Sequence, residues 1–313
     1  MKDCKYCLYL PPLGLLSSLK SLLIKGLDGI VSIGAEFYGS NSSSFKSLER
    51  LKFYDMKEWE EWECKTTSFP RLRCLFMVQC PKLKGLSEQL LHLEKLYIES
   101  CPNLIISEHI EGTSALELLR TRSCPLVNIP MTHYDFIEEM RIFSGCDSLT
   151  IFQLNFFPVL RVLCLSGCQN LQRILQEHAH NHLKKMTIRE CPQFESFPDE
   201  GLSVTFPSLT ELEITGCPKV EKFPDGGLPS KVKHMYLSSI KLIVSLRENL
   251  DVNTCLQSLT IENLEVESFP DEVLLPPSLT SLAINNFPNF IFPFTKFVNL
   301  NLFIFLLLNF YSL

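Results

Sequence analysis

The amino-acid sequence predicts an α/β repeat solenoid, with short parallel strands on one side and irregular or short helical segments on the other. The first observation is a phrase, L-x-x-L-x-I-x-x-C-P-x-F, that spans residues 183–194 and returns at 209–220, 93–104 and 72–83. The second is the alternation of apolar and other residues around its second leucine, which is typical of a strand with one buried face. Because one such unit cannot bury its apolar face alone, the recurring copies predict stacking into a single solenoid.

The spacing of the units narrows the class. If the consensus cysteine, or the residue replacing it, marks the phase, successive markers are 21 to 29 residues apart. This period and pattern are those of leucine-rich repeats. We therefore expect a leucine-rich-repeat horseshoe with a parallel β-sheet on the concave face, formed by about 13 units over residues 1–290, the first one truncated. The markers are Cys4, Leu27, Met56, Cys80, Cys101, Cys124, Gly145 or Cys146, Cys168, Cys191, Cys217, Ile240, Leu264 and Phe287.

Each part of a unit has an expected place. The leucines, isoleucine and cysteine fill the interior, where a buried aliphatic side chain contributes roughly 1.5–3 kcal/mol. The proline after the cysteine lacks an N–H and is expected to end the strand. On the convex side, segments 86–91 and 174–178 are the best candidates for short helices, and an extra residue in 140–146 predicts a local bulge.

Residues 291–313 form an atypical apolar tail. Three asparagines interrupt it after residue 297, so only residues 302–308 are continuously apolar. A spanning helix needs about 20 apolar residues. We expect an end unit of irregular sequence that lies over the last repeat, and no membrane association.

Composition limits the function classes. The chain has 313 residues and a net charge of -6, whereas generic nucleic-acid binding needs a basic excess. Its 13 cysteines fall mostly once per unit, as expected for reduced, buried thiols in an intracellular protein. One glycosylation sequon occurs at 41–43, and residues 1–7 lack the apolar region of a secretory signal. We expect a cytoplasmic protein.

The variable positions that flank the second leucine of each unit form the expected binding surface, because solenoids use their concave side for binding. In the first eight units these positions are mainly basic and aromatic, and arginine and tyrosine are frequent interface anchors. Two interpretations stay open: a stripe that holds an acidic protein partner, and a charged face that is simply solvated. The candidate residues are Arg50, Lys52, Tyr54, Phe76, Lys95, Tyr97, Arg120, Arg122, Arg141, Phe143, Lys185, Arg189, Glu211, Glu213 and Tyr236.

Other constellations are weaker. Trp59 and Trp62 lie among glutamates, either as a partner-docking loop or as packed core residues, and packing is favoured because large aromatics are mostly buried. The lone C-x-x-C of Cys4 and Cys7 lacks the second pair of a zinc site, so Cys4 is expected to pack in repeat phase. The histidines at 178, 180 and 182 have no cysteine or carboxylate at suitable spacing. Without a catalytic motif, we expect no catalysis, cofactor or metal.

Several motifs resemble plant intracellular disease-resistance receptors of the coiled-coil nucleotide-binding leucine-rich-repeat class. These are residues 10–14 (LPPLG), 32–38 (SIGAEFY) and 56–62 (MKEWEEW), followed by Cys-Pro-x-Leu and Phe-Pro-Asp units. The resemblance implies a leucine-rich-repeat module that contributes to recognition of a pathogen effector and restrains the nucleotide-binding switch. Its implied partners are an effector, a guarded host protein or the receptor's own nucleotide-binding domain.

The chain departs from that class in one respect. It has no G-x-x-x-x-G-K-[ST] phosphate loop, so ATP binding is not carried over. Three alternatives stay open: an extracellular receptor ectodomain, a substrate-receptor subunit of a ubiquitin ligase, and a non-functional receptor fragment. An ectodomain would show many sequons, and a ligase subunit would need an adaptor-binding helical domain.

Overall fold

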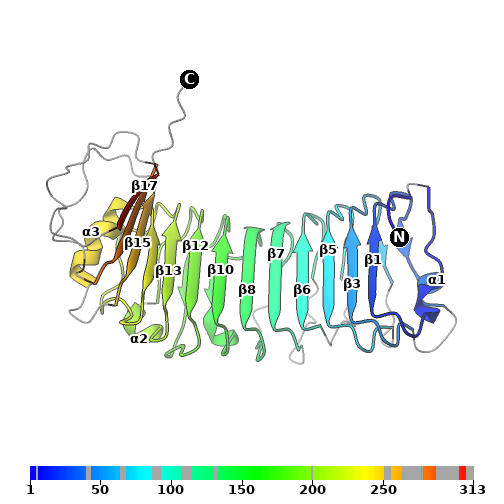
Figure 1. Ribbon diagram of the computed structural model, residues 1–313, viewed down its shortest axis with the longest axis horizontal. Helices are drawn as coiled ribbons and strands as arrows, with labels where there is room; N and C mark the ends of the chain where they lie inside the picture. Colours follow the sequence, from blue (N-terminus) through cyan, green and yellow to red (C-terminus); the bar gives the residue numbers. More distant parts are fainter. Residues whose placement is uncertain are drawn as a thin grey trace, which may run out of the picture. The chain divides into compact units, whose positions relative to one another are not determined.

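The computed structural model confirms the predicted solenoid of short parallel strands with little helix (Figure 1). The chain divides into unit 1, residues 1–149 and 156–160, and unit 2, residues 150–155 and 161–313. One of the boundaries between them, after Asn155, falls within a 3-10 turn, η2 (Leu154–Phe156). The structure describes residues 1–4, 6–39, 44–63, 68–86, 93–106, 115–129, 133–198, 200–249, 255–262, 276, 278–286 and 303–307.

Unit 1 is organised around a parallel sheet in which the strands follow one another in chain order. Its strands are β1 (Ser21–Lys25), β3 (Arg50–Tyr54), β5 (Cys74–Val78), β6 (Lys95–Glu99), β7 (Leu118–Cys124) and β8 (Glu139–Gly145). Neighbours pair in register, so Leu51 stands beside Leu75 and Leu75 beside Leu96. Burial alternates along each strand, and these leucines form a continuous interior ladder.

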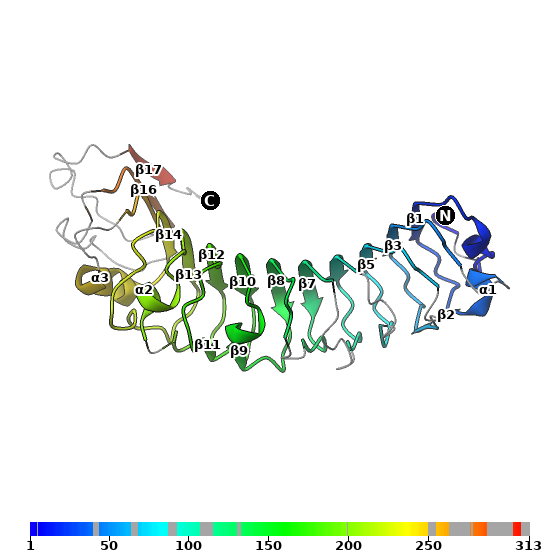
Figure 2. The ribbon, with the colours of Figure 1, turned by 90° about the horizontal axis from the view of Figure 1, so that it is seen from below.

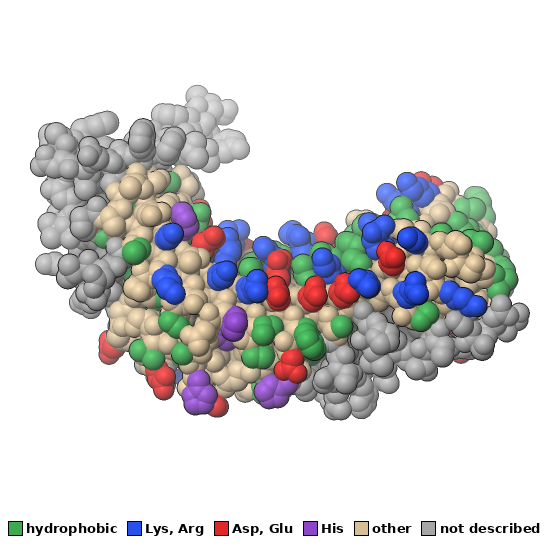
Figure 3. Space-filling view, turned by 60° about the horizontal axis from the view of Figure 1, so that its bottom comes forward, with side chains coloured by type: hydrophobic (Ala, Val, Ile, Leu, Met, Phe, Trp, Pro, Cys, Tyr) green, Lys and Arg blue, Asp and Glu red, His purple; other side chains and the backbone are tan. Residues whose placement is uncertain are grey.

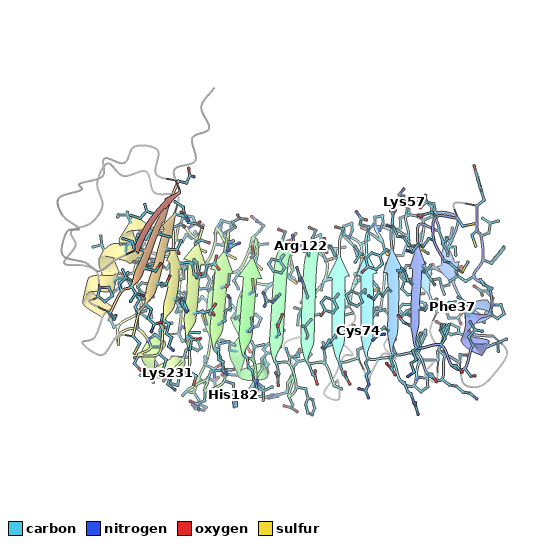
Figure 4. All side chains as sticks on the ribbon, in the orientation of Figure 1. Phe37, Lys57, Cys74, Arg122, His182 and Lys231 are labelled. Carbon is cyan, nitrogen blue, oxygen red and sulfur yellow. The ribbon has the colours of Figure 1, made fainter. Side chains whose placement is uncertain are left out.

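The return side of unit 1 contains an aromatic cluster. The turn η1 (Leu13–Leu15), the short helix α1 (Ala35–Tyr38) and the two-residue strands β2 (Ser32–Ile33) and β4 (Glu61–Trp62) lie on this side. Trp59 is fully buried and packs on Phe53 with ring centroids 4.5 Å apart. Trp62 is nearly buried and donates from Nε1 to the hydroxyl of Tyr38 at 2.8 Å. Both tryptophans are therefore core residues, as packing predicted, and neither offers a docking surface. Phe37, labelled in Figure 4, belongs to the same cluster, 4.8 Å from Phe45 between ring centroids.

Unit 2 repeats the same arrangement. Its main strands are β10 (Val162–Ser166), β12 (Lys185–Arg189), β13 (Glu211–Thr215), β14 (His234–Leu237), β15 (Ser258–Glu262), β16 (Ser281–Asn285) and β17 (Phe303–Leu307). The last of these pairs in parallel with β16, from Ser281 beside Phe303 to Asn285 beside Leu307. Part of the apolar tail thus adds a strand to the end of this sheet. The predicted boundary at residue 290 lies outside the described residues and stays a prediction.

The return side of unit 2 differs from the expectation in its helices. Figure 2 shows the paired strands β9 (Ile151–Gln153) and β11 (Arg173–Leu175) on the opposite side of unit 2 from β10 and β12. The prediction of a helix at 174–178 was therefore wrong, because Ile174 is buried in β11, which pairs with β9. In the described part of unit 2, the helices are α2 (Leu202–Thr205) and α3 (Ile240–Asn249).

Helix α3 occupies a unit in which no Cys-Pro follows the strand. Without that proline the backbone N–H groups stay available, and the N–H of Ile243 bonds to the carbonyl of Ser239 at 3.1 Å. Leu242, Ile243 and Leu246 are buried, at the spacing of one helix face. The candidate helix at 86–91 lies almost wholly outside the described residues.

A left-handed residue, rather than the proline, ends most strands. Among the described residues, the residue immediately before the phase marker has a positive φ at Asp3, Gly26, Asp55, Gln79, Ser100, Ser123, Gly167, Glu190, Gly216 and Asn286, and at Ser144 where Gly145 is taken as the marker. Most are not glycine, although this conformation costs other residues about 1–2 kcal/mol. Its recurrence indicates that the sharp turn from strand to return segment is required by stacking.

The phase cysteines form a buried ladder. Cys80, Cys101, Cys124 and Cys146 in unit 1 are at most 1% exposed. The exception is Cys4, which is exposed, so its expected packing was wrong.

The extra residue in 140–146 is absorbed at a close backbone approach. Cys124 pairs with Gly145, and both Ser144 and Cys146 adopt positive φ. A Cβ on Gly145 would lie 2.8 Å from the carbonyl oxygen of Cys124, which explains the glycine.

Within the described residues, no helix has the length and apolar character needed to span a bilayer.

Candidate functional site

The fifteen residues predicted for the binding surface all lie on the exposed side of the strands. They alternate with the buried leucine and isoleucine positions, and none of them is buried. In unit 1 they belong to β3, β5, β6, β7 and β8, and in unit 2 to β12, β13 and β14. Because parallel pairing is in register, they fall into rows that cross neighbouring strands. Whether these residues bind a partner stays a prediction.

In unit 1 the outward side chains of β3, β5, β6, β7 and β8 make a surface that we call the cationic strand face. It has six Lys or Arg residues, Arg50, Lys52, Lys95, Arg120, Arg122 and Arg141, and two acids, Glu99 and Glu139. Arg141 pairs with Glu139 at 2.5 Å. For the other five cations, no acidic side chain lies within ion-pairing distance in the part of the chain that is described. Figure 4 shows Arg122 towards the end of β7.

Aromatic rings hold several of these cations in place. The ammonium of Lys52 lies 4.6 Å from the ring centroid of Phe76, and the other face of Phe76 stacks on Tyr97 at 4.3 Å with 4° between the rings. The guanidinium groups of Arg120 and Arg122 lie 5.3 and 4.8 Å from the ring centroid of Phe143. Such cation–π contacts are each worth about 0.5–1 kcal/mol at exposed positions. Unlike a carboxylate, a ring orients the cation without cancelling its charge.

An acidic edge borders this surface where the strands begin. Glu94, Glu117 and Glu138 each precede a strand, and the backbone ladder links them, since the N–H of Glu117 bonds to the carbonyl of Glu94 and the N–H of Glu138 to that of Glu117. Figure 3 shows acidic and basic side chains gathered side by side along the strands. Glu94 is paired with Arg73 at 3.4 Å. The face is therefore a cationic band with an anionic border.

In unit 2 the corresponding cations are neutralised by the next strand. Lys185 on β12 pairs with Glu211 on β13 at 2.5 Å. Arg189 donates to Glu213 through Nε at 2.8 Å and also through Nη2. This hydrogen bond raises the pKa of Arg189 above its ordinary value. We call these four residues the paired strand face. Its charges are satisfied within the chain and do not require a partner.

The remaining outward positions were not singled out from sequence. Cys74, Val78 and Leu118 are half-buried on the cationic strand face, and Cys74 stands at the start of β5 in Figure 4. Burial raises the pKa of the Cys74 thiol, and the charges of Lys52 and Lys95 only partly oppose this. Cys74 is therefore not an activated nucleophile. In unit 2, Tyr236 is exposed and stands beside Glu213, which is bonded to Arg189.

The other candidate constellations do not come together. Cys4 is exposed and Cys7 is half-buried. His178 and His182 are exposed, whereas His180 is buried, and its Nδ1 accepts the N–H of Leu183 at 3.2 Å. Among the described residues, no three His, Cys, Asp or Glu side chains are grouped so as to hold a metal ion.

Comparison with known proteins confirms the resemblance seen in the sequence. The chain is 31% identical over 217 residues to the putative disease resistance RPP13-like protein 1 of Arabidopsis thaliana. The matched residues make up 63% of this chain and 18% of that protein. It is 36% identical over 99 residues to the probable disease resistance protein RF45 of the same plant, covering 32% and 9%. It is 26% identical over 162 residues to the probable disease resistance protein RF9, covering 51% and 14%.

These matches are partial on both sides. The chain spans less than a fifth of the length of these relatives. No family model matches it. The similarity and the fold together identify a leucine-rich-repeat region like those of plant disease resistance proteins.

Proposed function

We propose that this chain is a protein-interaction module of a plant immune receptor, acting in the cytoplasm, where it contributes to recognition of a pathogen effector and to autoinhibition of the receptor. The single observation that carries the proposal is the cationic strand face: five charged side chains stand on a sheet without an acidic ion-pair partner in the described chain. A surface of this kind gains more from a partner than a face whose charges are already paired. The similarity to disease resistance proteins supports the biological setting.

The proposed role is binding, without enzymatic activity or a cofactor. The strand face offers ammonium, guanidinium and aromatic groups, which anchor protein interfaces well. The proposed partners are an effector, a guarded host protein or the nucleotide-binding domain of the same receptor.

The test is an interaction assay with a nucleotide-binding half from a receptor of the same plant. The chain and that half are co-expressed in leaf cells, and association is measured by co-precipitation. A second arm replaces the half with a library of effectors from pathogens of that plant. We expect association in at least one arm, with weakening when Arg120 and Arg122 are both changed to glutamate. A correctly folded chain that associates with nothing in either arm would contradict the proposal.

A further inference from the structure

The cationic strand face is organised so that its charges stay available. Lys52 rests on Phe76, and Arg120 and Arg122 rest on Phe143, at 4.6 to 5.3 Å from the ring centroids. In the paired strand face, by contrast, carboxylates take up the equivalent charges. The two strand faces therefore have the same strand geometry and opposite charge states: the cationic strand face keeps its positive charge exposed, and the paired strand face neutralises it.

The ring of Phe76 has little stacking surface left for a ligand. Phe76 has Lys52 on one side and Tyr97 stacked in parallel on the other, so both of its faces are covered. Phe143 is approached by two guanidinium groups. Single-stranded nucleic acids bind basic surfaces by stacking bases on free aromatic faces. Phe76 presents its edge instead, which carries the positive part of the aromatic quadrupole and favours anionic atoms.

The acidic edge also selects against a continuous polyanion. A nucleic-acid backbone carries a charge at every nucleotide and would meet Glu94, Glu117 and Glu138 beside the cations. Glu94 adjoins Lys95, and Glu117 lies three and five residues from Arg120 and Arg122 along the chain, roughly 10 and 17 Å at about 3.3 Å per residue. A polyanion long enough to run from these arginines along the strand would therefore meet the acidic edge. A polypeptide can place carboxylates over the cations and neutral or basic residues over the border.

We propose that the cationic strand face binds an acidic polypeptide segment, whose carboxylates engage Lys52 at one end and Arg120 and Arg122 at the other. Three strand steps separate Lys52 from Arg120, which is roughly 14 Å at about 4.8 Å per step. An extended segment crossing the strands covers this distance with about four to five residues. The paired strand face of unit 2 takes no part. This inference rests on the proposed function and names the chemistry of the partner.

The experiment measures fluorescence anisotropy of labelled probes with the full chain. The probe is a dodecapeptide of alternating glutamate and serine, and the control peptide has glutamine in place of glutamate. A uridine oligonucleotide of twelve nucleotides forms the third arm. We expect the glutamate peptide to bind at least tenfold more tightly than the glutamine peptide, and the affinity to fall several-fold between about 50 and about 300 mM salt.

Two variants with the same change of net charge locate the site. Arg120→Gln with Arg122→Gln should weaken binding of the glutamate peptide at least tenfold. Lys231→Gln with Lys233→Gln removes two exposed cations away from the outward rows of the strands and should change it less than twofold. Phe143→Leu keeps every charge but removes the ring that orients Arg120 and Arg122, so we expect a loss of roughly two- to fivefold. Circular dichroism shows that each variant is folded.

Three results would overturn the inference: equal binding of the two peptides, equal losses in the two double variants, or tighter binding of the oligonucleotide than of the glutamate peptide. None of them decides the proposed function. A chain that still associates with a nucleotide-binding half or an effector keeps that function and loses only the acidic-segment assignment.

Discussion

Truncating Trp59 to alanine tests whether the aromatic cluster of unit 1 is a structural core. The side chain is completely buried, with Phe53 at 4.5 Å and Trp62 at 5.8 Å between ring centroids. Its Nε1 donates to the carbonyl of Glu61 at 2.8 Å, which fixes the start of β4. If this cluster were a docking surface, its loss would affect binding and leave stability nearly unchanged.

The expected cost follows from burial. An aromatic side chain removes about 200 Å² from water, worth about 5 kcal/mol at about 25 cal/mol per Å². Alanine retains part of that area, and tryptophan-to-alanine changes in cores typically cost about 3–5 kcal/mol. Trp59→Phe keeps most of the apolar area and loses the hydrogen bond, for which we expect about 1–2 kcal/mol. The two variants should therefore fall in a graded order.

Urea unfolding followed by tryptophan fluorescence measures the effect locally. The chain has two tryptophans, both in this cluster, so the signal in Trp59→Ala comes from Trp62 and reports on unit 1. Tyr9→Ala is the control, because Tyr9 is 73% exposed and surface changes usually stay within about 0.5 kcal/mol. A loss below about 1 kcal/mol for Trp59→Ala, comparable to the control, would refute the core assignment.

Three further outcomes follow from the interior and the turns. Burial raises the pKa of Cys124 to about 11 and that of Cys146 to about 12, so both thiols stay protonated below pH 9. Alkylation at pH 8, followed by mass spectrometry, should therefore label the exposed Cys255 and spare Cys124 and Cys146 unless the chain is denatured. Gly145→Ala should cost about 1–3 kcal/mol in chemical denaturation, because its Cβ would collide with a neighbouring carbonyl; an unchanged midpoint would disprove the close approach. Gln79 is exposed and has a φ of 56°, a left-handed conformation that valine disfavours and glycine adopts readily. Gln79→Val should therefore destabilise unit 1 by about 1–2 kcal/mol, whereas Gln79→Gly should not. Equal effects of the two changes would argue against a left-handed turn at this position.

The strand pattern was predictable because it depends on period and burial alone. The alternation around Leu96 and Leu212 fixes which residues face the interior, and stacking at a constant period fixes the parallel order. The turn that ends each strand was attributed to the proline after the cysteine. The left-handed residue before the cysteine escaped notice, because positions such as Gln79 and Glu190 carry side chains that rarely adopt it. Only the requirement to stack, which is a tertiary constraint, shows why they do.

The binding surface was predictable in position but not in charge state. Sequence places Arg122 and Arg189 at equivalent exposed positions and counts both as cations in one stripe. Side-chain contacts, rather than register, decide their difference. Arg122 stands between Glu99 on β6 and Phe143 on β8, and its guanidinium lies over the ring. Arg189 stands beside Thr215 on β13 and bonds diagonally to Glu213 of the same strand. A list of charges therefore overstates the positive surface of unit 2 and understates the contrast with unit 1. What makes the cationic strand face a candidate for binding is not its number of cations but the aromatic neighbours that leave their charge uncancelled.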